Sequence, residues 1–445
     1  MNIYIKTYGC QMNERDSEAC SGMLVARGHS LATTEKEADV LIYNTCSVRD
    51  QAERKAIGKV GIMKRLKRKK PELIIGIMGC MAQNHGEKLL KELPHVDFII
   101  GTGQLHKVPD IIEELSNERV KHVLVTESPD VLDEMGTHYA IDNKQIFAQV
   151  AITRGCNRFC SYCIVPYVRG REISRKIADI VKEVDELVVN GVKEILLLGQ
   201  NVAAFGLGGD INPPAPDVSP FADLLAELNN IKGLERIRFT SPYPSYFTDK
   251  LINAIITLPK VCNNIQLPLQ SGSNRILKAM NRQYTAEQYL EIINKLKKSI
   301  PEVTFATDVI VGFPEESDED FAATRDLLNE VGFTNAYLFK YSPRQGTPAA
   351  AMPDQVPQKV KEKRHRILLE DLKQRTIAHN KTFVGTTQEI LVEGPSKRNH
   401  ERWTGKTTNG KHVMFTWQAG INPGSIVKVS IKHCSTASLF ADIIE

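Results

Sequence analysis

The chain has 445 residues, of which 42% are hydrophobic and 25% charged, and its formal net charge is +4. This length and composition are typical of a soluble globular protein with about two to four domains. No apolar run reaches the roughly 18 residues of a membrane-spanning helix, which excludes that class. The net charge alone is too small to indicate a protein that binds polyanions, so the position of the charges matters more.

The first residues, MNIYIKTYGC, contain no basic segment followed by an apolar one, so we expect no secretory signal. We therefore expect a reducing, cytoplasmic environment. In such a compartment the nine cysteines are expected to be metal ligands or reactive thiols rather than disulfides.

Strand and helix patterns alternate in the first part of the chain. We expect strands over residues 2–9, 38–45, 72–79 and 96–101, and helices over 14–28, 48–70, 86–93 and 108–115. Repeated βα units predict an open parallel α/β sheet covered by helices, in a domain of residues 1–126. The acidic, irregular residues 127–143 are expected to form a linker.

A second βα series begins near residue 145. We expect its strands over residues 146–152, 194–199, 236–241, 263–268, 304–312 and 335–342. Six βα units predict a partial (β/α)6 barrel, an open relative of the eight-unit form, in a domain of residues 142–375. The Pro-rich residues 211–220 are expected to form a surface loop.

The last part of the chain has a different pattern. Residues 357–383 predict a basic amphipathic helix, and the short strands and turn signals that follow predict a small all-β barrel. We place this third domain at residues 376–445. The expected fold class is therefore α/β, with an open sheet, a partial barrel and a small β domain.

Three cysteines follow the first barrel strand in a Cys-x3-Cys-x2-Cys arrangement: Cys156, Cys160 and Cys163. Three thiolates this close can ligate three irons of a [4Fe–4S] cluster and leave the fourth iron open to a ligand. The main alternative is structural zinc, but that metal uses four ligands, and no second cysteine pair is present. Core packing fits poorly, because the intervening residues are polar.

These residues resemble a known family. Cys-x3-Cys-x-aromatic-Cys, with Tyr162 as the aromatic residue, resembles the signature of radical S-adenosylmethionine (SAM) enzymes, which have a partial (β/α)6 barrel. Further segments resemble the MiaB-type tRNA methylthiotransferases, which add a TRAM domain, an RNA-binding module, at the C-terminus. These segments are TYGCQMNERDSE, NTCSVRDQAERK, RGCNRFCSYCIVPYVRGRE, LLGQNV, QLPLQSGSNRILKAMNR, DVIVGFPEE and YSPRQGTPAA.

The resemblance implies a second [4Fe–4S] cluster, and the strand pattern independently indicates a site for it. Cys10, Cys46 and Cys80 each follow a predicted parallel strand of the first domain. The carboxyl ends of such strands share one edge of a sheet, where ligands bind, and adjacent strands lie about 4.8 Å apart. We therefore expect these three cysteines to converge, whereas Cys20, Cys262 and Cys434 are expected to be packing residues or free thiols.

The resemblance also implies contacts to SAM and to RNA. Expected SAM contacts are Tyr162, Gly199, Gln200, Asn201, Ser241, Gln266, Gln270, Asp308 and Gly312. Expected RNA contacts on the basic helix and the β domain are Lys359, Lys363, Arg364, Arg398, Arg402, Trp403 and Lys406. The basic run at residues 64–70 has a simpler explanation, since cations are favoured at a helix C-terminus.

The activity implied by the resemblance is methylthiolation of C2 of N6-isopentenyladenosine at position 37 of tRNA, with two SAM molecules used per turnover. Such an enzyme also needs an electron donor, such as flavodoxin or ferredoxin, and a sulfur source or iron–sulfur carrier; we expect a monomer. Sister enzymes modify threonylcarbamoyl-adenosine in tRNA or an aspartate of a ribosomal protein. An iron–sulfur RNA-binding regulator without catalytic activity is the alternative from a different class.

Overall fold

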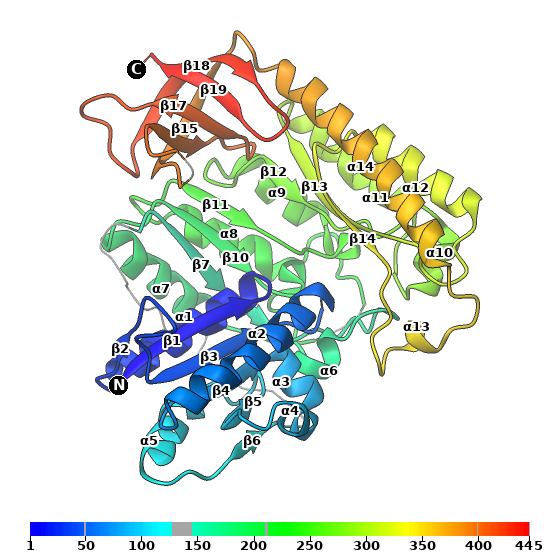
Figure 1. The fold of residues 1–445 in the computed structure, drawn as a ribbon. Coiled ribbons are helices and arrows are strands. Elements are labelled where there is room, and N and C mark those ends of the chain that lie inside the picture. Colours follow the sequence, from blue (N-terminus) through cyan, green and yellow to red (C-terminus); the bar gives the residue numbers. More distant parts are fainter. Residues whose placement is uncertain (49, 127–144, 210–211, 398, 445) are drawn as a thin grey trace.

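The computed structural model describes residues 1–48, 50–126, 145–209, 212–397 and 399–444. Figure 1 shows an N-terminal α/β sheet in blue, a central partial barrel in green and yellow, and a small C-terminal barrel in red. The expected α/β fold class with these three parts is confirmed. The expected linker, residues 127–143, lies outside the described residues. None of the described helices is long and apolar enough to cross a bilayer.

The N-terminal sheet is parallel throughout, in the order β2-β1-β3-β4-β5-β6. Its strands are β1 (Asn2–Tyr8), β2 (Ser30–Leu31), β3 (Val40–Thr45), β4 (Ile74–Gly79), β5 (Phe98–Ile100) and β6 (His122–Leu124). Every residue of β3 and β4 is buried, because helices cover both faces of the sheet. The four expected strands are confirmed, and the structure adds the short strands β2 and β6 at the two edges.

The helices of this domain divide between the two faces of the sheet. They are α1 (Gln11–Ala26), α2 (Asp50–Lys69), α3 (Cys80–His85), α4 (Glu87–Glu92), η1 (Leu105–Lys107) and α5 (Val108–Asn117). One apolar core includes residues of α2 and α4, and another includes residues of α1 and α5. The sheet is therefore the middle of a three-layer unit, with helices on both of its faces.

The central domain is an open barrel of six parallel strands. They are β7 (Phe147–Ala151), β10 (Glu194–Leu198), β11 (Arg236–Phe239), β12 (Asn264–Gln266), β13 (Thr304–Val311) and β14 (Asn335–Lys340). They pair as β7–β10–β11 and β12–β13–β14, and a parallel bridge from Ile237 to Val261 links the two sets. The six expected strands are thus confirmed, in chain order around the barrel.

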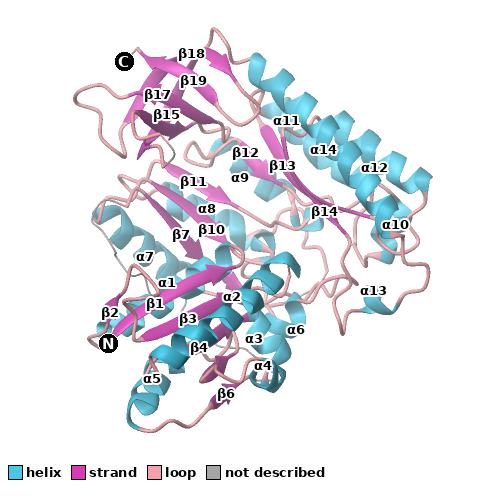
Figure 2. Cartoon of the chain, in the orientation of Figure 1, coloured by secondary structure: helices cyan, strands magenta, loops and turns pink. Residues whose placement is uncertain are grey.

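Helices cover the outside of this barrel (Figure 2). The longer ones are α7 (Ile177–Val189), α8 (Pro220–Asn229), α9 (Asp249–Thr257), α11 (Ala286–Ser299) and α12 (Asp318–Val331). Shorter elements at the strand ends are α6 (Val165–Arg169), η2 (Val202–Ala204), η3 (Pro244–Tyr246), α10 (Asn274–Ala279) and α13 (Pro348–Ala351). The antiparallel pair of β8 (Thr153–Arg154) and β9 (Ile173–Ser174) encloses the segment that contains Cys156, Cys160 and Cys163.

The long helix α14 (Gln358–Lys381) runs along the barrel beside β13 and β14 and leads into the C-terminal domain (Figure 1). That domain is a closed barrel in the order β15-β16-β17-β19-β18, as expected. Its strands are β15 (Thr387–Pro395), β16 (Arg402–Lys406), β17 (His412–Thr416), β18 (Ile426–Cys434) and β19 (Leu439–Ile443).

The outer domains contact the central barrel at different places. Helix α1 of the N-terminal domain packs Met12 against Ala151, Leu196 and Leu198 of β7 and β10. The C-terminal barrel instead docks at the amino ends of the strands, where Arg238 of β11 donates to the carbonyl oxygens of Thr407 and Thr408 at 2.8 and 3.1 Å. The two outer domains therefore leave the carboxyl edge of the central barrel facing the N-terminal sheet.

Candidate metal centre

Cys10, Cys46 and Cys80 lie at the carboxyl ends of three neighbouring strands, β1, β3 and β4. The register aligns Tyr8 with Thr45 and Thr45 with Gly79, so each cysteine follows an aligned position by one or two residues. Cys46 and Cys80 are 1% and 2% exposed, whereas Cys10 is partly exposed at the N-terminus of α1. The structure thus brings together the three cysteines that the strand pattern predicted.

Two buried asparagines hold the loops that carry these cysteines. The Asn13 side chain donates to Asn44 Oδ1 at 3.0 Å, and Asn44 Nδ2 donates to the Asn13 carbonyl oxygen at 2.8 Å. Gly79 has a φ of +96°, and a Cβ there would lie 2.3 Å from Asn44 Oδ1. Glycine is therefore required immediately before Cys80, and the network fixes the spacing of the loops.

The thiols of Cys10 and Cys46 interact directly. Their hydrogen bond lowers the pKa of Cys10 and raises that of Cys46, so Cys10 is the favoured thiolate of the pair. Burial raises the pKa of Cys80, and the charge of Arg169 opposes that rise. A site that holds soft, electron-rich sulfur next to a cation suits metal coordination, since the thiolate is the ligand form.

The second group of cysteines lies on the loop between β8 and α6. Gly155 precedes Cys156 with a φ of +78°, and a Cβ there would meet the Arg171 carbonyl oxygen at 1.9 Å. The amide of Cys156 donates to the Gly170 carbonyl oxygen at 3.1 Å, so the loop is anchored where it begins and ends. Burial raises the pKa of Cys156 and of Cys163, the latter to about 12.

The two groups of cysteines are joined through α6. Cys80 packs with Ile164 and Val168, two residues of the segment that directly follows Cys163. The Thr102 hydroxyl, after β5, donates to the Val168 carbonyl oxygen at 2.6 Å and strengthens this contact. Both groups therefore border the same region between the N-terminal sheet and the partial barrel.

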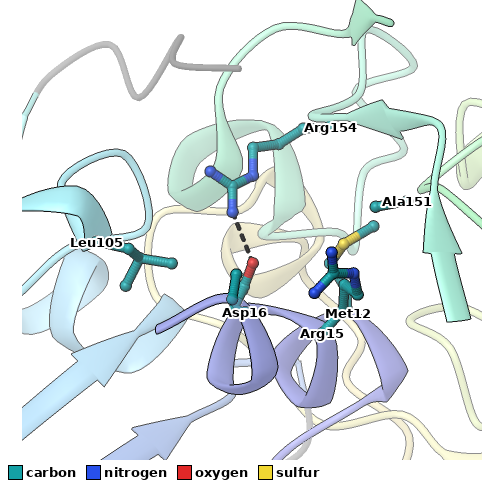
Figure 3. Close-up of a pocket in the computed structure, with 7 residues that line it drawn as sticks. Met12, Arg15, Asp16, Leu105, Ala151 and Arg154 are labelled. Carbon is teal, nitrogen blue, oxygen red and sulfur yellow. Dashed lines mark hydrogen bonds and ion pairs between the residues drawn. The ribbon is translucent and has the colours of Figure 1, made fainter. Parts of the chain in front are cut away.

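Charged side chains are buried at this domain boundary. Asp16 of α1 accepts hydrogen bonds from Arg154 at 2.6 Å and from Arg169 at 2.8 Å. Figure 3 shows Asp16 directed toward Arg154, with Met12 and Arg15 from the same helix beside them. The small cavity that these residues line has a volume of about 10 Å³, which is room for a single water rather than a ligand.

The chemistry of both cysteine groups fits [4Fe–4S] clusters. Each offers three sulfur donors on short, anchored loops, which leaves one iron of a cubane without a protein ligand. In the described part of the chain, no three His, Cys, Asp or Glu side chains lie close enough to hold a single metal ion. In a cubane each thiolate binds a different iron, so the three cysteine sulfur atoms can lie farther apart than the ligands of a single metal ion.

Several of the expected SAM contacts form a hydrogen-bonded row across the strand ends. The Ser241 amide donates to Gln266 Oε1 at 3.2 Å, and Gln266 Nε2 donates to Asp308 Oδ2 at 2.7 Å. Gln270 joins this row through its amide, which donates to the Asp308 carbonyl oxygen at 2.7 Å. Ser241 and Gln270 have φ values of +59° and +70°, strained conformations of the kind that gathers at ligand sites.

The remaining expected SAM contacts border the same carboxyl edge. Gln200 Oε1 and Asn201 Nδ2 are buried and have no hydrogen-bond partner among the described residues, so both are available to a polar ligand. Gly199 and Gly312 lie at close approaches, because a Cβ would be 2.2 Å from Thr153 Oγ1 and 2.3 Å from Lys361 Cγ, respectively. Tyr162 packs into the apolar cores beside the cysteine loop.

The expected RNA contacts separate into exposed and structural residues. Lys359, Lys363 and Arg402 are exposed, and Trp403 is half-buried beside the exposed Trp417 at a ring distance of 6.0 Å. Arg398 lies outside the described residues.

The structure does not place Arg364 on the RNA-facing surface that the sequence predicted. Arg364 is 5% exposed and forms ion pairs with Glu316 at 2.6 Å and Asp318 at 2.8 Å, so it fastens α14 to the barrel. Lys406 is also partly enclosed, at the docking contact between the C-terminal barrel and Arg236. Their positive charges were visible in the sequence, but their tertiary partners were not.

Two arginines near the cysteines were missed by the sequence analysis. Arg282 Nη1 lies 3.5 Å from Cys160 Sγ, and its guanidinium lies 4.0 Å from the centre of the Tyr243 ring. Arg169 borders the other group of cysteines from the end of α6. Both lie in segments already quoted for their resemblance, AMNR and YVRG, but only Arg169 lies in a cysteine-rich segment, so the sequence offered a signal for Arg169 and none for Arg282.

Known family models match the chain in the same order as the three structural parts. The Uncharacterized protein family UPF0004 matches residues 2–101, the Radical SAM superfamily matches 150–328 and the TRAM domain matches 381–444. Among solved structures, the radical SAM methyltransferase TsrM from Kitasatospora setae, with cobalamin and a [4Fe-4S] cluster bound, has a TM-score of 0.55 at 13% identity. That likeness covers 78% of this chain and 74% of TsrM, and it concerns the fold alone.

Relatives along the full length are much more similar. Proteins named tRNA-2-methylthio-N(6)-dimethylallyladenosine synthase are 44% identical in Opitutus terrae and 46% identical in Clostridium perfringens, each over 99% of this chain and 97% of the relative. The protein of that name from Akkermansia muciniphila is 42% identical over 98% of both chains. The chain therefore belongs to the family of tRNA-2-methylthio-N(6)-dimethylallyladenosine synthases, the MiaB-type radical SAM methylthiotransferases.

Proposed function

We propose that this chain adds a methylthio group to C2 of N6-isopentenyladenosine at position 37 of tRNA. The observation that carries the proposal is the meeting of two groups of three cysteines at one domain boundary, in a chain whose full-length relatives carry that name. The target C2–H bond is unactivated, so acid–base chemistry by side chains alone is a poor route to substitution.

We assign one [4Fe–4S] cluster to Cys10, Cys46 and Cys80, and another, which binds SAM, to Cys156, Cys160 and Cys163. When bound, the clusters and SAM supply the one-electron chemistry and the sulfur and methyl groups that the protein itself lacks. The chain's own contribution is to anchor both loops, exclude water and hold the two sites at a common boundary.

The polar groups at the carboxyl edge of the barrel are the proposed SAM contacts. Gln200 and Asn201 have unsatisfied buried groups that can bind polar atoms of SAM, and the Gln266–Asp308 pair offers a carboxylate for hydroxyl or amino groups. Gly199 and Gly312 allow Thr153 and Lys361 to approach the backbone closely there. Tyr162, Ser241 and Gln270 remain proposed contacts on the strength of their position.

The RNA surface is proposed to extend from the boundary between the domains to the C-terminal barrel. Arg402, Trp403 and the exposed Lys359 and Lys363 are suited to phosphate contact and stacking. Because the C-terminal barrel docks at the amino ends of the strands, an RNA that contacts it and the cysteines has to extend along the molecule. A tRNA is long enough to do so, whereas a free nucleoside is not.

We further propose a cytoplasmic monomer that receives electrons from a flavodoxin or ferredoxin and sulfur from a separate donor. Domain limits of 1–126, 142–375 and 376–445 are proposed for the three parts.

The decisive test is mass spectrometry of tRNA nucleosides from cells that lack the protein, with and without its return. We expect 2-methylthio-N6-isopentenyladenosine to disappear and to be restored. Loss of the methylthiolated threonylcarbamoyl derivative instead, or of the modified aspartate in ribosomal peptides from the same cells, would transfer the proposal to a sister activity. If the protein is a regulator without catalytic activity, none of these three modifications should change. The purified protein should then also release no 5′-deoxyadenosine when dithionite and SAM are added.

A further inference from the structure

A carboxylate shared by two arginines is buried between the N-terminal domain and the partial barrel. Asp16 pairs with Arg154 and with Arg169, and all three side chains are at most 4% exposed. The two guanidiniums therefore share one carboxylate, and a further anionic group beside Arg169 would stabilise its buried charge.

Arg169 is the arginine that faces the cysteines of the N-terminal sheet. It ends α6, whose Val168 packs against Cys80. Its Nη2 donates to Asp16, whereas its Nη1 is buried and has no conventional hydrogen-bond partner among the described residues. The guanidinium acts electrostatically on both Cys80 and Cys10.

We propose that Arg169 is the buried counter-charge of the Cys10, Cys46 and Cys80 group, supplied across the domain boundary by the radical SAM domain. This inference rests on the proposed function, in which these three thiolates hold a cluster. With a cluster bound, the unpartnered Nη1 can donate a charge-assisted hydrogen bond to anionic sulfur, one of the strong kinds in proteins. Arg169 touches no substrate in this role and is a positioning residue.

The role has two consequences. Reduction adds a negative charge to a cluster, so a nearby cation stabilises the reduced form and makes the midpoint potential less negative. In addition, Arg169 reaches the cysteines only while the two domains are docked, through the Asp16 contact, the Met12 packing and the hydrogen bond from Thr102 to Val168. The electrostatic environment of the N-terminal cluster is therefore completed by docking and is not a property of the N-terminal domain alone.

The test uses the full chain with Cys156, Cys160 and Cys163 changed to Ala, so that only the N-terminal cluster is present. In this background we compare Arg169→Gln, Arg169→Lys and Arg154→Gln after anaerobic reconstitution, by redox titration followed with electron paramagnetic resonance. Arg154→Gln is the matched control, because it removes the other arm of the same ion pair. We expect a more negative potential for Arg169→Gln, a smaller shift for Arg169→Lys, and a value near the parent for Arg154→Gln.

Equal potentials for Arg169→Gln and Arg154→Gln would overturn the inference, because both variants lose a contact to Asp16. If Arg169→Gln does not fold, Asp16→Asn provides a test of opposite sign. It removes the negative charge beside Arg169, so the potential should become less negative, and an unchanged potential would contradict the proposal. A parent that retains no iron would instead contradict the ligand assignment of the proposed function, which keeps the two failures distinguishable.

Discussion

The two groups of cysteines are proposed to have the same ligand chemistry, but they are arranged in opposite ways along the sequence. Cys156, Cys160 and Cys163 lie within eight residues on one loop, whereas Cys10, Cys46 and Cys80 come from three βα units of a parallel sheet. The first group has a nearby cation from its own domain, Arg282, and the second has Arg169 from the neighbouring domain. The surroundings of the first group are therefore complete within one domain, whereas those of the second group depend on domain docking.

The largest effect is expected from removing each group in turn. Changing Cys156, Cys160 and Cys163 to Ala should abolish both 5′-deoxyadenosine release and methylthiolation, because no site for SAM cleavage remains. Changing Cys10, Cys46 and Cys80 to Ala should abolish methylthiolation but leave 5′-deoxyadenosine release. Each triple change should lower the iron content from about eight to about four per chain.

Iron analysis and product quantification on the same anaerobic sample check this prediction. A triple variant that kept all its iron would show that its cysteines are not ligands. Loss of both clusters from either variant would show that the two sites do not load independently.

Cys80 separates ligation from packing with a single substitution. Cys80→Ala should reduce methylthiolation to background while 5′-deoxyadenosine release persists, because a cubane held by two thiolates is expected to be labile. The matched control is Cys20→Ala, since Cys20 is also fully buried in the same domain but lies in α1, away from the strand ends. That change should cost about 1 kcal/mol of stability and leave the iron content unchanged.

Normal methylthiolation and iron content in Cys80→Ala would mean that the cysteine is a packing residue. Both variants need a thermal melt before the assay, so that loss of product is compared at equal folded fraction.

The difference between the two groups also explains what the sequence could and could not predict. The strand pattern predicted that Cys10, Cys46 and Cys80 share one edge, because parallel pairing places successive strand ends together. It could not predict that Asn13 and Asn44 fix the loops, because these residues are 31 positions apart in the sequence and meet only in the folded domain. Nor could β2 and β6 be expected, because two or three residues are too short to show a pattern.

The ion pair between domains offers a smaller and purely thermodynamic comparison. Asp16→Asn should lower the free energy of unfolding by about 3–5 kcal/mol, because it leaves two buried guanidiniums without their carboxylate. Arg27→Gln is a suitable control, since its pairs with Asp110 and Glu113 are exposed and its loss should leave the free energy of unfolding nearly unchanged. Chemical denaturation of the apo protein measures both.

The same carboxylate predicts a dependence on pH. Burial alone would raise the pKa of Asp16, but Arg169 and Arg154 outweigh it, and the net shift in the folded protein is downward. The stabilisation is thus fully present above the unfolded value near 3.8 and is lost as the pH falls through the lower folded value. The difference in stability between the wild type and Asp16→Asn should narrow at acidic pH, and a constant difference would contradict the assignment.

The smallest expected effect distinguishes RNA contact from structural charge on α14. Lys359→Ala and Lys363→Ala remove exposed cations, so each should weaken tRNA binding by about 2- to 5-fold and reduce its salt dependence, with no change in the melting temperature. Arg364→Ala, one residue from Lys363, removes a buried partner of Glu316 and should lower the melting temperature while binding per folded molecule changes little. Salt titrations of tRNA binding, set beside thermal melts, measure both. If Lys363→Ala lowered the melting temperature and Arg364→Ala altered only the salt dependence, the division of this helix into an RNA-facing side and a barrel-facing side would be wrong.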